Sequence, residues 1–486
     1  MNKIALVACF MALLSAPAVV QAQTIYPDVN SDGEVNIADV NGVISFILQG
    51  NTEVPSPNKE FLSAREYGAV GDGVTDDTEA LEKLFDAAFR QKKAVFFDQG
   101  VYMIRRSLTL RSGMEIYGYK ATLKKNAAVT TTLAVAAVKD QTFIDVASAE
   151  GFNVGDQFVI ADSDGANWCT YGLVTAVEGN RIHFKNIISD TQSNFPGCVR
   201  QYPAGYKVST SFALLRSWAS RFACEGVYIH DLTLDGNKRS DEARSWANSC
   251  IHMDSYYENG YTGQSGIEYR NAQRNLIARN LVIMNSPHDG ISDQSAGGLI
   301  VTDCRIENSA MHGVHLGTRF AGALISNNRM AGNGVAGAGV FFCQTVTNVI
   351  VDNNQFTFFN HGCSDEEFGT SVKYVTIRNN QFKNITGYVF DFLRATSAVH
   401  GGGLQISNNT VEGLKAALFS GDFLDDVIIS NNEVKSVKIP PTNLINVVDS
   451  KNVIISGNTV PSTVSLAEPV KSTNTTNLVQ SGNSWN

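Results

Sequence analysis

Three of the eight histidines, His288, His312 and His315, fall within 28 residues of the chain, close to Asp289 and Arg319. Histidine titrates near neutral pH and is the commonest general acid or base in enzymes. Arginine binds carboxylates and neutralises the charge that builds on an enolate. This combination suits β-elimination from a uronic acid, in which a base removes the proton next to the carboxylate. We expect His312 or His315 to be that base and Arg319 to hold the carboxylate.

The same histidines allow other interpretations. His288, His312 and Asp289 have the residue types of a metal site. Stacked histidines can also be purely structural and hydrogen-bond the backbone of neighbouring turns. Hydrolysis of a glycan instead needs two carboxyl groups about 6.5–9.5 Å apart in an inverting enzyme, and Asp289 and Asp293 are the candidates here. Further acids that later turns could supply are Asp365, Glu366 and Asp391.

A short strand pattern that begins with glycine places more candidates beside the histidines. It occurs at residues 266–270, 290–293, 313–317 and 339–342. If the branched residue after each glycine points inward, the residues that face solvent on one sheet are Glu268, Arg270, Ser292, His315 and Phe341. Glu268, Arg270 and Phe341 are therefore candidate substrate-binding residues. The aromatic residues Phe341 and Phe342 also leave open a non-catalytic glycan-binding surface protein.

These candidates belong to a repeat that must position them. A four-residue pattern, apolar, polar, Asn or small, then Asn, recurs at steps of 23 to 29 residues, and its last positions are Asn280, Cys304, Asn328, Asn354, Asn380, Asn409, Asn432, Asn458 and Asn483. A period near 25 with short Val/Ile-rich strands predicts an all-β fold, a parallel β-solenoid. Asparagine tolerates the left-handed conformation of a corner, and stacked amides can hydrogen-bond as a ladder. We interpret these asparagines as scaffold.

The N-terminus carries the pattern of an exported protein. Residues 1–22 combine Lys3, an apolar run and small residues before a cleavage site, which predicts a signal peptide and a secreted bacterial protein. Besides Cys9 there are seven cysteines, so at least one is unpaired in the monomer. Cys224 and Cys250 lie about one repeat apart and could be stacked neighbours. The formal charge of −9 argues against nucleic-acid binding, and no transmembrane segment is expected after residue 22.

A calcium loop follows the predicted signal peptide. Oxygen-bearing residues and a turn glycine, Gly33, recur over residues 28–39 with the spacing of an EF-hand loop. The candidate Ca²⁺ ligands are Asp28, Asn30, Asp32, Glu34, Asn36 and Asp39. Residues 23–50 resemble one half of a dockerin, the module that docks polysaccharide-degrading enzymes onto scaffolds, which implies a possible scaffold or cell-surface partner. Residues 51–60, with two prolines, are expected to be a linker.

The remaining chain, residues 61–486, opens with a characteristic signature. Residues 67–81 read YGAVGDGVTDDTEAL, and a helix is expected from near Asp76 to about Arg90, covering the open end of the solenoid. Residues 130–210 interrupt the repeat and predict a small β-insertion. The signature and the Asn repeats resemble the pectate-lyase-like right-handed parallel β-helix superfamily, in its rhamnogalacturonase- and epimerase-like branch. The resemblance implies a secreted enzyme that processes an acidic polysaccharide.

The family resemblance leaves the reaction open. Polygalacturonases share this fold and carry an Asp on one turn and an Asp-Asp pair on the next. Here the first turn offers Asp289 and Asp293, but the next turn reads Ala310-Met311-His312-Gly313, without an Asp pair. We therefore expect a lyase, with a glycoside hydrolase of the same fold as the alternative.

Overall fold

A computed structural model describes residues 60–161, 169–187 and 196–485, except 220, 244, 255–272, 344, 366–371, 394 and 467. Residues 59–486 form one compact unit. The predicted signal peptide, the calcium loop and all but the last residue of the linker lie outside the described residues. No helix within the described part of the chain has both the length and the apolar character that crossing a membrane requires.

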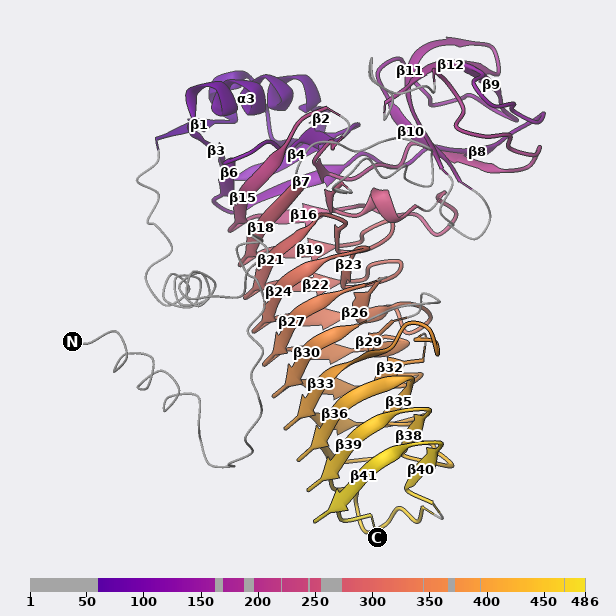
Figure 1. The fold of residues 1–486 in the computed structure, drawn as a ribbon. Coiled ribbons are helices and arrows are strands. Elements are labelled where there is room, and N and C mark those ends of the chain that lie inside the picture. Colours follow the sequence, from indigo (N-terminus) through magenta and orange to yellow (C-terminus); the bar gives the residue numbers. More distant parts are fainter. Residues whose placement is uncertain are drawn as a thin grey trace. The chain divides into compact units, whose positions relative to one another are not determined.

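The unit is a parallel β-solenoid, in which three sheets run along the coil and successive strands of each sheet come from successive turns (Figure 1). In spatial order, sheet A consists of β1 (Phe61–Ser63), β3 (Ala94–Phe97), β6 (Glu115–Gly118), β15 (Cys224–His230), β18 (Gln273–Arg279), β21 (Gly297–Thr302), β24 (Ala321–Ser326), β27 (Thr347–Asp352), β30 (Lys373–Arg378), β33 (Gly401–Ser407), β36 (Leu424–Ser430), β39 (Lys451–Ser456) and β41 (Thr476–Ser481).

Sheet B consists of β2 (Asp72–Asp76), β4 (Gly100–Ile104), β7 (Ala121–Lys125), β16 (Thr233–Asp235), β19 (Val282–Met284), β22 (Arg305–Glu307), β25 (Arg329–Ala331), β28 (Gln355–Thr357), β31 (Gln381–Lys383), β34 (Thr410–Glu412) and β37 (Glu433–Val434). Sheet C consists of β5 (Leu108–Thr109), β14 (Leu215–Arg216), β17 (Ile251–Met253), β20 (Ile291–Asp293), β23 (Val314–Leu316), β26 (Ala338–Phe342), β29 (His361–Ser364), β32 (Phe390–Phe392), β35 (Phe419–Asp422), β38 (Ile445–Val448) and β40 (Val470–Thr473).

The core of the solenoid is built from alternate residues of these strands. In sheet A, Val301, Ile325, Val351 and Ile377 pair in register and are fully buried in one cluster. Side chains alternate between the two faces of a strand, so the residues between them point away from the core. The predicted β-solenoid is confirmed.

The asparagines at the corner divide into two adjacent rows. Asn328, Asn354 and the later ladder residues to Asn458 are buried, and each accepts hydrogen bonds at Oδ1 from the preceding ladder residue. The left-handed conformation belongs instead to the residue before each ladder position, such as Asn327 with φ 60°. The repeat pattern predicts Asn280 as the first residue of the buried ladder, and this prediction is wrong. The backbone N–H of Asn280 donates to Thr302 and its φ is 49°, so it belongs to the left-handed row, where tolerance of positive φ is needed.

The helix α3 (Thr78–Gln91) lies where the opening signature predicts a helix. Its apolar residues Leu81, Leu84, Phe85 and Ala88 share one face and join the core cluster. Thr78 N–H donates to Asp76 Oδ1 at 3.1 Å, which supports the helix start. Its role in covering the open end of the solenoid stays a prediction. Two short 3₁₀ helices complete the described elements, Arg65–Tyr67 and Trp246–Asn248.

Six antiparallel strands form a separate sheet between β7 and β14, in the region of the expected insertion. In spatial order they are β8 (Thr130–Thr132), β13 (Lys207–Ser209), β10 (Gln157–Ala161), β11 (Thr170–Glu178), β12 (Arg181–Asn186) and β9 (Phe143–Asp145). This inserted sheet has its own buried cluster, which includes Trp218 from the chain that follows β14. Ser107 N–H also donates to Gln157 Oε1 at 3.0 Å. The inserted sheet therefore packs on the solenoid near the start of sheet C.

The suggestion that Cys224 and Cys250 are stacked neighbours is wrong. Cys224 begins β15 in sheet A, whereas Cys250 comes directly before β17 in sheet C. The sequence interval matches one repeat, but the two residues occupy different sides of the coil. All seven described cysteines are free thiols, and six of them are buried.

Candidate functional site

One row of side chains crosses sheet C on the face opposite to the core. Its strands place Ile251, Ile291 and Val314 in the core, so the residue after each of them points outward. The outward residues that pair in register from strand to strand are Arg216, His252, Ser292, His315, Phe341, Ser364, Asp391 and Ser420. We call these residues the sheet C row.

The sheet C row differs from the expectation in two respects. Its residues were expected to face solvent, but each is at most 8% exposed. The strand before β20 in sheet C is β17, because this turn of the solenoid is longer than the average repeat, and the strand expected at residues 266–270 lies outside the described residues. Glu268 and Arg270 lie outside the described residues.

Asp289 is the centre of the histidine cluster. It sits in the turn before β20, fully buried, with Oδ2 2.9 Å from His315 Nδ1 and Oδ1 3.0 Å from His288 Nδ1. The backbone N–H of His312 also donates to Asp289 Oδ1 at 3.1 Å. Burial disfavours the carboxylate, but the charges of His288 and His315 outweigh it and hold the pKa of Asp289 well below its usual range. Asp289 is therefore an anion that orients its neighbours.

His315 is the cation of this pair. Burial alone would lower its pKa, but Asp289 and the nearby Cys343 thiol raise the pKa of His315 to about 10. Its Nε2 is buried and makes no hydrogen bond of ordinary geometry, although the Cys343 sulfur is close enough to act on its charge. The ring meets Phe341 edge-on at 4.7 Å between centroids. At neutral pH, His315 thus holds a proton on Nε2 that a bound oxygen could accept.

His312 is neutral and already engaged. The backbone N–H of Ala338 donates to His312 Nδ1 at 3.0 Å, which leaves the ring proton on Nε2. Burial lowers the pKa of His312 to about 3. The ring stacks on Phe341 at 4.2 Å. While the bond to Ala338 persists, His312 has no lone pair available for removing a proton.

His252 is a functional candidate that the sequence analysis did not identify. It lies two strands from His315 on the sheet C row, with Ser292 between them. Burial lowers the pKa of His252 to about 4, although Asp254 opposes this with an oxygen 3.7 Å from His252 Nε2. The signal was present, because Ile251-His252-Met253 has the same pattern as Val314-His315-Leu316. The pattern that begins with glycine predicts residues 266–270 at this position instead.

The remaining carboxylate candidates are spread over different parts of the coil. Asp293 pairs with Met253 and Leu316, which are core residues, so its side chain is on the core side, and burial raises its pKa to about 6. Asp391 lies on the row beside β29, where its Oδ2 is 3.5 Å from His361 Nδ1. Asp365 is buried after β29, and Glu366 lies outside the described residues.

Arg319 lies on the turn after β23, exposed and with φ 60°. In the Asp289 cluster, His312 lies before β23 and His315 within it, whereas Arg319 follows the end of that strand. Among the described residues, Asp289, His312 and His315 could hold a metal ion together, because their ligand atoms lie within 4.8 Å of one another. This set differs from the predicted one because His315 replaces His288. Two histidines and one carboxylate suit a transition metal.

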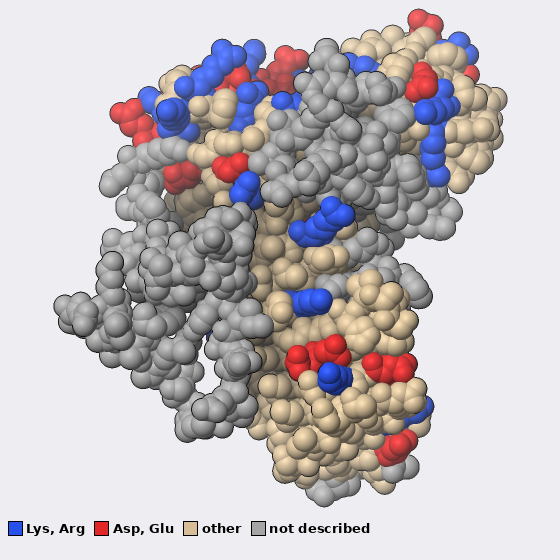
Figure 2. Space-filling view, in the orientation of Figure 1, with Lys and Arg blue, Asp and Glu red and all other residues tan. Residues whose placement is uncertain are grey.

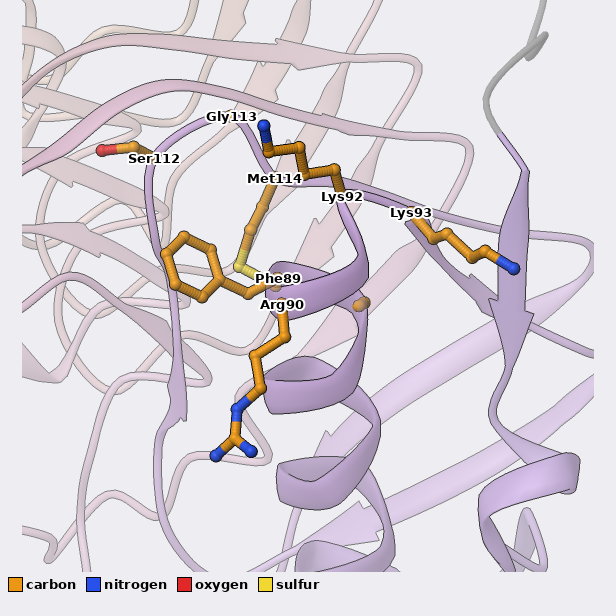
Figure 3. A pocket seen from close by; sticks show the side chains of 8 residues that line it. Phe89, Arg90, Lys92, Lys93, Ser112, Gly113 and Met114 are labelled. Carbon is orange, nitrogen blue, oxygen red and sulfur yellow. The ribbon is translucent and has the colours of Figure 1, made fainter.

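A separate hollow lies at the end of α3 (Figure 3), lined in part by Phe89, Arg90, Lys92, Lys93 and Met114. On the face shown in Figure 2, Lys and Arg side chains gather in the part of the unit that carries α3. None of the sheet C row lines this hollow, and it holds no acid/base pair of the kind found around Asp289.

The coil of three parallel sheets defines a parallel β-helix protein. Residues 265–460 match the family described as right handed beta helix region. Residues 61–315, more than half of the chain, match the family described as rhamnogalacturonase A/epimerase, pectate lyase-like. The chain belongs to this second family.

Solved structures of similar fold include the family 28 exopolygalacturonase of Yersinia enterocolitica, with TM-score 0.50 and 14% identity over 87% of this chain and 78% of that one. The Dettilon tailspike protein has TM-score 0.52 and 11% identity over 85% of this chain and 68% of that one. The glucan 1,3-β-glucosidase of Cochliobolus carbonum is 43% identical over 58 residues, 12% of this chain and 7% of that protein. The chain spans less than a tenth of the length of the curated relatives it matches. The structural likenesses show the fold alone.

Proposed function

We propose that this protein is a carbohydrate-active enzyme that cleaves an acidic, uronate-containing polysaccharide by β-elimination on the sheet C row. The observation that carries the proposal is a pair of imidazoles on one row with opposite shifts, the pKa of His252 lowered to about 4 and that of His315 raised to about 10. Titratable groups whose environments push their pKa values apart are typical of an acid and a base. Membership of the rhamnogalacturonase A/epimerase family supports a glycan as the substrate.

The two imidazoles have complementary roles in this scheme. Ser292 is small and lies between them on the row, and the two imidazoles are about 10 Å apart at the backbone. Neutral His252 accepts the proton from the carbon next to the uronate carboxylate. The carbon–oxygen bond of the glycosidic link then breaks, and His315 Nε2 donates its proton to the leaving oxygen. The proposed base is therefore His252, and not His312 or His315 as expected from the sequence. His315 is protonated, and His312 accepts a hydrogen bond from the Ala338 N–H.

The carboxylates near the pair favour elimination over hydrolysis. Asp289 accepts the His312 N–H and pairs with two imidazoles. Asp254 accepts the Ala219 N–H at 3.3 Å and lies 3.9 Å from Arg216. An inverting hydrolase needs a second carboxylate that is available to activate water. Here both carboxylates beside the imidazoles hold other groups in place, so the imidazoles are the proton carriers.

The test is to incubate the full-length protein with polygalacturonate, rhamnogalacturonan, alginate and hyaluronan, and to follow ultraviolet absorbance and reducing ends together. β-Elimination gives an unsaturated uronate that absorbs in the ultraviolet. His315→Gln should lower kcat by about 10²- to 10⁴-fold, the usual contribution of a general acid. His183→Gln, on the inserted sheet, is the matched control and should keep full activity. Reducing ends without absorbance indicate the hydrolase, and binding without cleavage indicates the non-catalytic glycan-binding protein.

The pH profile gives an independent check. His252 loses its basic lone pair when it is protonated below about pH 4, and His315 loses its proton above about pH 10. The rate should therefore be high between these values and fall on both sides. His252→Gln should remove most of the activity, because the base is lost. An unchanged profile in His315→Gln would exclude His315 as the acid.

The N-terminal residues complete the proposal. We also propose export through residues 1–22 and Ca²⁺ binding by the loop at residues 28–39, which the sequence predicts, and docking to a scaffold or cell surface, which the resemblance to a dockerin implies. Isothermal titration of the exported chain with Ca²⁺ tests the loop, and Asp32→Ala should abolish the binding.

A further inference from the structure

The first residue of the sheet C row, Arg216, is an unusual buried cation. It is 1% exposed and lies next to His252 in register. Its guanidinium lies over the Trp218 ring at 4.2 Å and over the Tyr171 ring at 5.2 Å. Contacts with two aromatic rings stabilise a cation and fix the plane of the guanidinium.

The hydrogen bonds of Arg216 are incomplete. Its Nη2 is 3.9 Å from Asp254 Oδ1, which is too long for a direct hydrogen bond. Its Nε and Nη1 are buried and have no hydrogen-bond partner. A buried donor without a partner costs free energy, and a charged donor costs more. Arg216 is therefore held in position with donors that a bound anion can satisfy.

We infer that Arg216 binds the carboxylate of the substrate and determines the preference for an acidic sugar. This inference rests on the proposed function. The carboxylate is bonded to the carbon that loses the proton, so the two must be bound side by side. Arg216 and His252 are adjacent on the row, about 5 Å apart at the backbone, whereas His315 is two strands further along. The order of the row thus matches the order of groups in β-elimination.

The inserted sheet contributes to this subsite. Tyr171 comes from β11, and its hydroxyl forms a hydrogen bond with Ser245 Oγ. Trp218 belongs to the core cluster of the inserted sheet and donates from Nε1 to Thr109 Oγ1 at 3.2 Å. The two aromatic rings that hold Arg216 therefore depend on the inserted sheet, and the inserted sheet contributes to substrate binding. In this inference Arg216, and not Arg319 as expected from the sequence, binds the carboxylate.

The experiment compares Arg216→Lys and Arg216→Met with Arg221→Lys and Arg221→Met. Arg221 is the matched control because its guanidinium also lies over Trp218, at 4.8 Å, but it is exposed. Binding of oligosaccharides from the four glycans is measured by calorimetry, with free carboxyl groups and after methyl esterification. A sulfated neutral oligosaccharide is the third ligand. Far-ultraviolet circular dichroism and the melting temperature establish that each variant is folded.

The wild type should bind the free acid about 10- to 100-fold more tightly than the ester, the range for a charged hydrogen bond. Arg216→Met should abolish this ratio without weakening binding of the ester, and Arg216→Lys should keep part of it. The Arg221 variants should keep the wild-type ratio. An acid preference that survives in Arg216→Met, or a wild type without one, would overturn the inference. So would tighter binding of the sulfated ligand than of the uronate, because the anion recognised would then be a sulfate ester.

If Arg216→Met is unfolded, Arg216→Lys decides alone: an unchanged ratio of acid to ester would overturn the inference, and a reduced ratio would support it. The proposed function fails separately. In that case the wild type binds the free acid through Arg216 and releases no unsaturated product.

Discussion

Two rows of stacked residues run along this solenoid, and they differ in amino-acid composition and in the role that we assign to them. The ladder from Asn328 to Asn458 repeats one residue, and each amide accepts from the residue before it. The sheet C row has the same geometry, with neighbours one strand apart, but unlike residues occupy its positions. The first row is a scaffold, and the second row is the candidate site.

The difference follows from hydrogen-bond complementarity. An asparagine amide has both donors and an acceptor, so a stack of identical amides satisfies itself. Arginine and protonated histidine have donors only, and a row that contains them needs acceptors from elsewhere. Asp289 supplies an acceptor for His315 Nδ1, but two nitrogens of Arg216 stay without one, and His315 Nε2 has only the Cys343 sulfur nearby. The candidate site therefore lies where the row does not repeat one residue and donors are left without acceptors.

The sharpest way to test the scaffold role is Asn380→Ala. This change removes the acceptor of two donors on Asn354, and the Val351 carbonyl loses the donor that it accepts from. Asn354 Nδ2 keeps its bond to the Ile325 carbonyl, so two buried groups lose a partner. Each costs about 1–3 kcal/mol, and we expect a loss of about 2–6 kcal/mol in the free energy of unfolding. Urea denaturation followed by circular dichroism measures it. A loss below about 1 kcal/mol would mean that the ladder does not stabilise the coil.

A second test concerns Asp293, which has the residue type of a catalytic acid but points into the core. Its pKa is raised by burial to about 6, above the value of an exposed carboxyl, so the folded state binds the proton more tightly than the unfolded state does. The contribution of Asp293 to stability is therefore fully present below about pH 4 and is lost as the pH rises through about 6. Asp293→Asn removes the charge and keeps the shape.

At pH 8 we expect Asp293→Asn to be more stable than the wild type by about 3 kcal/mol, and the difference should vanish near pH 4. Unfolding curves over this pH range measure it. Activity should stay within about tenfold of the wild type, since the side chain is not on the sheet C row. A loss of activity as large as that of His315→Gln would place Asp293 back among the catalytic residues.

The smallest effect is expected at the left-handed corner beside the ladder. Asn379 has φ 58° and is exposed, and Asn379→Ala should cost about 1–2 kcal/mol because a Cβ disfavours this conformation. Asn379→Gly should cost less, since glycine adopts positive φ freely. Melting temperatures of the two variants compare them. An equal cost would show that the side-chain bond from Asn379 to Asp352, not the backbone conformation, matters at this corner.

Much of the fold was accessible to sequence reasoning because a repeat of about 25 residues constrains it at many points. The period and the short Val/Ile-rich strands predicted the parallel coil, and the asparagine spacing predicted the corner. The register of Asn280 was missed by one residue, because two adjacent corner positions both favour asparagine. His252 and Asp254 were missed because their turn of the coil is longer than the average, so a fixed period selects the wrong strand.

The sequence by itself determined the coil, the family and the grouping of His312, His315 and Asp289 on neighbouring turns. Periodicity predicts the coil and this grouping, because residues one repeat apart stack where the turns have the average length. The family follows from the resemblance that the opening signature and the Asn repeats carry. Only the tertiary structure decided the charge of each group and its availability. Protonation depends on burial and on contacts such as Ala338 with His312, Asp289 with His315, and the inserted sheet with Arg216, and none of these follows from spacing along the chain.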